Sequence, residues 1–165
     1  MVTPEIYRDM VEEVAGLLEG FEGMEGAAEL VASGAAHMLG TSGTVTTLDA
    51  FGRIVACEHG GRRISRLGFD GRWQTIVDRF EGKRLNSPND VVVKSDGSIW
   101  FSDPSYGIDS DYEGHAAKSE IGACNVYRHD PQTGETTPVV TSLDRPNGLA
   151  FSPDERILYV SNTSL

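Results

Sequence analysis

The stretch that decides the fold is Ser87-Pro-Asn-Asp-Val-Val-Val-Lys-Ser-Asp-Gly-Ser-Ile-Trp-Phe-Ser-Asp103. A second stretch has the same plan, Arg145-Pro-Asn-Gly-Leu-Ala-Phe-Ser-Pro-Asp-Glu-Arg-Ile-Leu-Tyr-Val-Ser-Asn162. Each runs from Pro-Asn through a short apolar strand and a polar turn to an aromatic-rich strand with a small polar end. A phrase that recurs at this scale indicates a repeat architecture.

The repeats read as the blades of a propeller. Superposing the two stretches places Asn89 on Asn147, and a weaker third copy runs over 44–58 with Thr44 at the Asn position. Hairpins fall between the copies, one turning at Asp70-Gly71 and one around Asp130 to Gly134. Two strands of the phrase plus one hairpin make four antiparallel strands, which is the composition of a propeller blade.

The sequence therefore predicts an all-β fold with about two and a half four-stranded blades. One blade covers about 44–78, a second about 89–141, and a third begins at 147 and stops after its second strand. Residues 1–43 are a separate region, with a helix predicted over 4–19 followed by a Gly/Ala-rich segment. The expected domains are thus 1–43 and a partial propeller over 44–165.

Composition excludes several classes of partner. The formal net charge of -11 argues against nucleic acid and against an anionic membrane surface, both of which select clustered Lys and Arg. The N-terminus lacks a basic stretch followed by an apolar run, and no segment is long and apolar enough to span a bilayer. A cytoplasmic protein without nucleic-acid or membrane partners is expected.

Several motifs, in the right order, resemble the SMP-30/gluconolactonase/luciferin-regenerating (LRE-like) family, most closely its bacterial gluconolactonase branch. They cover about 44–165 and comprise Ala56-Cys-Glu-His-Gly-Gly-Arg-Arg-Ile64, Glu81-Gly-Lys-Arg-Leu-Asn-Ser-Pro-Asn-Asp-Val-Val-Val93, Asp96-Gly-Ser-Ile-Trp-Phe-Ser-Asp-Pro-Ser-Tyr-Gly-Ile108, Tyr112-Glu-Gly-His115, Ser119-Glu-Ile-Gly122 and Arg145-Pro-Asn-Gly-Leu-Ala-Phe-Ser-Pro-Asp154. The resemblance implies a six-bladed propeller of which this chain is a partial copy. It also implies hydrolysis of a lactone with a divalent cation in the central channel, usually Ca²⁺, or another such as Zn²⁺, Mg²⁺ or Mn²⁺.

The resemblance also implies site residues. It assigns Asn147 to the metal, Asn89 to the metal or the substrate, and Glu25 to the metal. Around Glu25 the family's Glu-Gly is present, but the Pro and the aromatic residue that follow it in the family are missing. The catalytic Asp of the family is expected in a blade beyond Leu165, so no catalytic residue is assigned.

The residues themselves leave alternatives open. An Asn oxygen is a hard neutral donor that calcium accepts, but an Asn can instead bond its own backbone in a turn. Asp90 could contact the substrate, could hold a metal ligand in place without touching the metal, or could serve only a turn. His59 ends a strand and could contact the substrate, or could be a buried structural histidine.

Two hypotheses of different class follow. The first is a metal-dependent sugar-lactone hydrolase of the gluconolactonase type. The second is a truncated, catalytically incomplete propeller without activity of its own, which could associate with itself through its open edge. A non-catalytic binding propeller is a third interpretation, which no feature of the sequence singles out.

Overall fold

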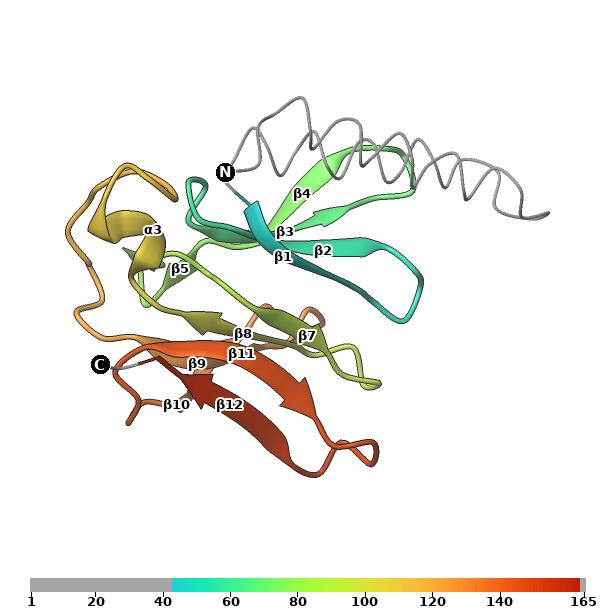
Figure 1. Ribbon diagram of the computed structural model, residues 1–165. Coiled ribbons are helices and arrows are strands. Elements are labelled where there is room, and N and C mark those ends of the chain that lie inside the picture. Colours follow the sequence, from blue (N-terminus) through green and yellow to red (C-terminus); the bar gives the residue numbers. More distant parts are fainter. Residues whose placement is uncertain (1–42, 164–165) are drawn as a thin grey trace, which may run out of the picture. The chain divides into compact units, whose positions relative to one another are not determined.

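The computed structural model describes residues 43–163, shown in colour in Figure 1. The predicted helix over 4–19, the Gly/Ala-rich segment and Glu25 lie outside the described residues. The domain boundary at 43/44 therefore stays a prediction.

The first blade is a four-stranded antiparallel sheet in the order β1-β2-β3-β4. Its strands are β1 (Gly43–Leu48), β2 (Ile54–Glu58), β3 (Arg63–Leu67) and β4 (Trp73–Val77). The predicted hairpin is confirmed, because β3 and β4 pair antiparallel on either side of its turn. Gly71 in that turn has φ of 73°, which a residue without Cβ adopts freely. The β1–β2 turn is held by Asp49, whose Oδ1 accepts the N–H groups of Phe51 and Arg53 at 2.9 and 3.0 Å.

The second blade has the order β10-β9-β8-β7, and two further strands begin the next one (Figure 1). Its strands are β7 (Val91–Val93), β8 (Ile99–Asp103), β9 (Asn125–His129) and β10 (Thr136–Val140); the pair that follows is β11 (Pro146–Phe151) and β12 (Leu158–Asn162). The predicted two and a half blades are confirmed. A short helix, α3 (Tyr106–Asp109), lies in the long insert between β8 and β9.

A short hairpin that the sequence pattern did not indicate joins the first two blades. It pairs β5 (Arg79–Phe80) with β6 (Lys83–Arg84). Each strand is only two residues long, too short for a strand periodicity to be visible. The hairpin leads directly into Leu85–Ser87, the approach to the first Pro-Asn.

The hydrophobic core lies between the first two blades. Its buried members are Val55, Cys57, Ile64, Val77, Leu85, Val91, Ile99, Phe101 and Tyr127. Phe101 stacks on Tyr127 with ring centroids 5.3 Å apart, and Trp100 meets Phe151 edge-on at 5.2 Å. Strand spacing predicts a core position for Tyr159 in the second aromatic-rich strand, but this residue is 58% exposed on β12.

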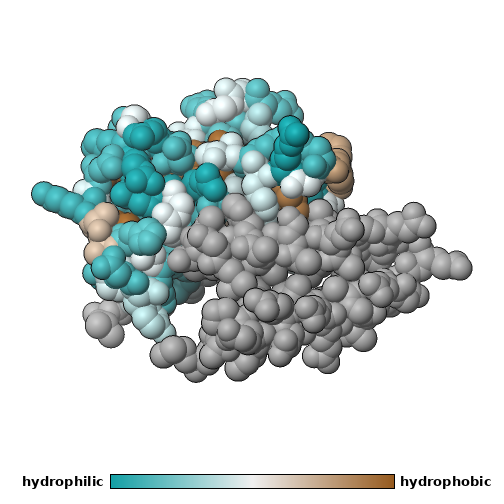
Figure 2. Space-filling view, turned by 90° about the horizontal axis from the view of Figure 1, so that it is seen from above, coloured by the Kyte–Doolittle hydropathy of each residue, from teal (hydrophilic) through white to brown (hydrophobic). Residues whose placement is uncertain are grey.

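The surface of the described residues is mainly hydrophilic on the face shown in Figure 2, with small separate apolar patches. Two of the most exposed apolar side chains, Phe51 and Phe69, have a polar neighbour. The Arg53 guanidinium lies 5.1 Å from the centroid of the first ring and 5.9 Å from that of the second. Such cation–π contacts make exposed aromatic rings tolerable at the turn end of the first blade.

Candidate functional site

The two asparagines of the repeated phrase meet in the structure. Asn89 stands two residues before β7, and Asn147 is the second residue of β11. The side-chain Nδ2 of Asn89 donates a hydrogen bond to Oδ1 of Asn147, and both side chains are half-buried. Residues 58 positions apart thus come together because equivalent strand starts of consecutive blades lie at the same end of the sheets.

A serine at the end of each following strand fixes the backbone next to these asparagines. Ser102 Oγ accepts the N–H of Asp90 at 3.1 Å, and Ser161 Oγ accepts the N–H of Gly148 at 2.7 Å. Ser102 Oγ also donates to the carbonyl of Asn147 at 2.7 Å, so it connects the two blades. The backbone on the C-terminal side of each asparagine is therefore held.

Asp90 links the two Pro-Asn segments through its carboxylate. Its Oδ2 accepts the N–H of Leu149 at 2.6 Å, and its Oδ1 accepts the N–H of Val91 at 2.9 Å. Both oxygens are thus engaged with backbone, one on each segment. This is a role in addition to the predicted contact with substrate, which stays a prediction.

His59 is buried next to Asn89. Its side chain is 1% exposed, and its Nε2 lies 3.2 Å from Asn89 Oδ1. Burial lowers the pKa of His59, and the Glu113 carboxylate, 3.7 Å from Nδ1, opposes that change. A neutral ring that carries its proton on Nε2 donates to Asn89 and orients it. Contact of His59 with a substrate stays a prediction.

Asp103 is the residue whose importance the sequence reasoning missed. Its place directly before Pro104 predicts a strand terminator, and it does end β8, but it is also fully buried. Its two carboxylate oxygens accept the N–H groups of Asn86 and Ser87, each at 2.9 Å. Burial raises its pKa to about 7, against the effect of these two donors and of Arg62. The signal was available, because Glu58 and Asn162 hold the same position in the other copies.

The cation site expected at this end of the sheets stays a prediction. Calcium takes six to eight oxygen ligands, and amide oxygens are among those it accepts. Asn89 and Asn147 bring two such amides together, which fits that chemistry. Residues 43–163 contain no group of three or more His, Cys, Asp or Glu side chains placed to hold a metal ion. A full set of ligands would therefore need donors from elsewhere, and Glu25 lies outside the described residues.

One cavity of about 290 Å³ lies at the opposite end of the strands. It is bordered by the β1–β2 turn with Asp49 and Arg53 and by the β7–β8 turn with Asp96 and Gly97. Strand direction places these turns away from Asn89 and Asn147. The cavity is therefore not the candidate site.

Over the described part of the chain, no helix has the length and apolar character that crossing a membrane requires.

Comparison with known proteins agrees with this architecture. The family described as SMP-30/Gluconolactonase/LRE-like region matches residues 23–165. A gluconolactonase of Zymomonas mobilis is 37% identical over 139 residues, which are 84% of this chain and 38% of that protein. A lactonohydrolase of Aspergillus oryzae is 36% identical over 93 residues, 56% of this chain and 21% of that one.

Solved structures give the same result. A gluconolactonase from Xanthomonas campestris superposes with a TM-score of 0.71 at 47% identity, covering 73% of this chain and 40% of that one. A streptogramin B lyase, at 14% identity and a TM-score of 0.52 over 74% of this chain and 34% of that one, shares the fold alone. The chain spans about two fifths of the length of the gluconolactonases it matches. It belongs to the SMP-30/gluconolactonase/LRE-like family.

Proposed function

We propose that this chain is part of a divalent-cation-dependent hydrolase that opens a sugar lactone of the gluconolactonase type. The observation that carries the proposal is the contact between Asn89 and Asn147, two amides brought together from consecutive blades. Membership of the family supports the reaction class. The relatives named gluconolactonase and lactonohydrolase support a lactone as the substrate.

Asn89 and Asn147 are the described residues that would hold the cation, with Glu25 as the expected third ligand. Oxygen donors favour Ca²⁺, while Zn²⁺, Mg²⁺ and Mn²⁺ remain to be compared by experiment. When bound, a divalent cation polarises a carbonyl oxygen and makes water easier to deprotonate.

The other residues of the site would hold the two amides in place. His59 orients Asn89 from below, and Asp90 and Ser102 join the backbones of the two Pro-Asn segments. Ligands that are held before binding lose less conformational freedom when the cation and the substrate arrive.

The reaction itself is a simple hydrolysis. Water adds to the carbonyl carbon, the ring C–O bond breaks, and the ring oxygen takes a proton to give a hydroxy acid. The chain has no Gly-x-Ser-x-Gly elbow for a serine nucleophile, which is consistent with direct attack by water. We assign no general base among residues 43–163. Cytoplasmic location and self-association through the blade edge are also predictions.

The test is lactone hydrolysis by the purified 165-residue chain. Metal is removed with a chelator, Ca²⁺, Zn²⁺, Mg²⁺ or Mn²⁺ is added back, and acid release from glucono-lactone is followed above the spontaneous rate. We expect hydrolysis only with a cation present, and a loss of roughly 100-fold in Asn147→Ala, because a metal ligand is removed.

The control variant is Gln132→Ala, in the exposed β9–β10 turn at the far end of the strands, which should retain full activity. A folded chain that hydrolyses no lactone with any of the four cations would contradict lactone hydrolysis by this polypeptide on its own. That result would favour the alternative of a propeller portion that has no activity by itself.

A further inference from the structure

The backbone that leads to Asn89 is buried. Leu85, Asn86 and Ser87 are each 0% exposed. They contribute two successive peptide groups, one between Leu85 and Asn86 and one between Asn86 and Ser87. A buried peptide group needs a partner for both its N–H and its C=O, because an unpaired one costs as much as a lost hydrogen bond.

Asp103 satisfies the N–H side of both peptide groups. Its Oδ2 accepts the N–H of Asn86 and its Oδ1 accepts that of Ser87, each at 2.9 Å. The carboxylate thus spans two consecutive donors with one oxygen each. Hydrogen bonds to the ionised form of such an acceptor are stronger than those between neutral groups.

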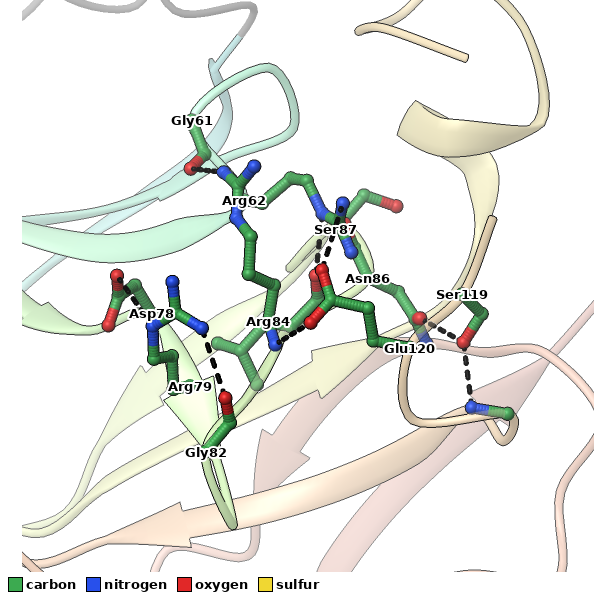
Figure 3. A network of polar contacts seen from close by, with 12 residues as sticks. Gly61, Arg62, Asp78, Arg79, Gly82, Arg84, Asn86, Ser87, Ser119 and Glu120 are labelled. Atoms are coloured by element: carbon green, nitrogen blue, oxygen red, sulfur yellow. Dashed lines mark hydrogen bonds and ion pairs between the residues drawn. The ribbon is translucent and has the colours of Figure 1, made fainter. Parts of the chain in front are cut away.

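Arg62 satisfies the C=O side of the same two groups. Its Nε donates to the carbonyl of Leu85 at 2.7 Å and to that of Asn86 at 3.1 Å. The Arg62 side chain is 8% exposed and lies beside Asn86 and Ser87 in Figure 3. Each peptide group is therefore held between a cationic donor and a carboxylate acceptor. We call this arrangement of Arg62 and Asp103 the Arg62–Asp103 clamp.

The clamp is separated from Asn89 by few free torsions. Pro88 follows Ser87 directly, and its ring fixes φ. The Ser87 hydroxyl is held as well, since it donates to the carbonyl of Pro104 at 2.7 Å and accepts the N–H of Gly107 at 2.9 Å. The direction in which Asn89 presents its amide therefore depends on where the clamp holds the Ser87 peptide.

We propose that Arg62 and Asp103 are positioning residues, which set the Asn89 amide against Asn147 by clamping the two preceding peptide groups. The predicted effect of these residues on cation affinity rests on the proposed function. Neither residue is proposed to touch the cation or the lactone. A purely structural role would predict a loss of stability with no change at Asn89 in the variants that remain folded.

The test uses Asp103→Asn and Arg62→Asn in the full chain. Asparagine at 103 can still accept one N–H, but its own NH₂ group then faces the other donor. Asparagine at 62 removes the guanidinium and tolerates the positive φ of 55° at this position. The two variants remove opposite sides of the clamp, so the second still tests the proposal if the first does not fold.

Two measurements are made below the melting temperature of each variant. In ¹⁵N–¹H spectra, the side-chain NH₂ signals of Asn89 should move towards the shifts of an exposed asparagine, while the signals of β1 stay in place. In calorimetric titration with CaCl₂, the affinity should fall about 10- to 100-fold, the range for residues that orient ligands.

The control is Val55→Ala, which lowers stability by removing core volume at the turn end of β2. It should leave both readouts unchanged. Folded Asp103→Asn and Arg62→Asn that keep the wild-type Asn89 signals would overturn the proposal. If wild-type protein neither binds Ca²⁺ nor hydrolyses lactone, the proposed function fails, and the Asn89 signals still decide the clamp.

Discussion

The backbone before the asparagine is held by the same contact in both Pro-Asn segments, but by different side chains in different surroundings. In each, the last residue of the paired strand accepts the N–H two positions before the asparagine. Asp103 Oδ1 accepts from Ser87 and Asn162 Oδ1 accepts from Arg145, both at 2.9 Å. The first segment is buried and held by a carboxylate and a guanidinium, whereas Arg145 and Asn162 are exposed.

The difference follows from access to water. An exposed backbone N–H loses little if its side-chain partner is weak, because water replaces it. Water cannot reach the two buried peptide groups of the first segment, so each of their N–H and C=O groups needs a hydrogen-bond partner from the protein. The electrostatic cost appears at Asp103, whose pKa is raised to about 7 by burial. The two copies therefore share the same backbone contact, while the residue that makes it is a carboxylate where the contact is buried and an amide where it is exposed.

The largest expected effect is the removal of the two strand-end side chains. Asp103→Ala should lower the free energy of unfolding by about 2–5 kcal/mol, because two buried N–H groups lose their acceptor and the nearby Arg62 loses a favourable charge. Asn162→Ala should cost about 0.5–1.5 kcal/mol. Urea unfolding of both variants measures the two losses. Equal losses would remove the distinction between the segments.

The pH dependence of stability tests the charge at Asp103. Its folded pKa of about 7 lies above the ordinary 3.8. Between these values the folded state binds more protons than the unfolded state, so stability falls as pH rises from about 4 to 7 and then levels off. Wild type should therefore lose stability relative to Asp103→Asn in this window, by at most about 1.4 kcal/mol per pH unit.

Urea unfolding of both proteins at several pH values from 4 to 8 measures this difference. Burial also lowers the pKa values of His59 and His129, which makes stability rise with pH near 6.5, but that contribution is common to both proteins. A wild type that gains relative to Asp103→Asn as pH rises would mean that Arg62 and the two N–H donors outweigh burial.

Glycine substitutions compare the packing around the two segments. A Cβ on Gly107 would lie 2.6 Å from His59 Cβ and 2.8 Å from Ser87 Cβ, whereas on Gly148 it would lie 3.2 Å from Ser161 Oγ. Gly107→Ala should therefore cost about 1–3 kcal/mol through overpacking, and Gly148→Ala clearly less. Thermal melting ranks them. A larger loss at Gly148 would place the tighter packing at the second segment.

The smallest expected difference concerns the two serines. Ser102→Ala should cost about 1–2 kcal/mol, because its buried hydroxyl serves both Asp90 and Asn147. Ser161→Ala, at an exposed site, should cost about 0.5 kcal/mol. Chemical unfolding of the two variants in parallel is sensitive enough. A costlier Ser161→Ala would show that the second segment depends more on its hydroxyl than its exposure suggests.

Local pattern was sufficient for much of the fold. A Ser-Asp-Gly turn separates two short runs rich in β-branched and aromatic residues, so the sequence predicted the strands Val91–Val93 and Ile99–Asp103. The short β5–β6 hairpin was not, because two-residue strands carry no period. Tyr159 was misplaced because a strand pattern does not say which face another blade covers.

At the site too, a sequence pattern carried information on residues that repeat along the chain, but not on contacts between different blades. The equivalence of Asn89 and Asn147 was predictable because they occupy the same place in two copies of one phrase, and the structure brings them into contact. The Arg62–Asp103 clamp was missed because its two side chains come from different blades and serve a backbone that belongs to neither strand. No spacing in the sequence encodes that arrangement.

The sequence by itself determined the blade repeat, the turns and the pairing of equivalent asparagines, since each depends on periodicity and on residues close along the chain. Only the tertiary structure decided that Asp103 is buried, that Arg62 reaches the opposite side of the same peptide groups, and that His59 lies under Asn89. The physical reason is that burial and charge pairing depend on which surfaces the blades bring together, and that is a property of the assembled fold.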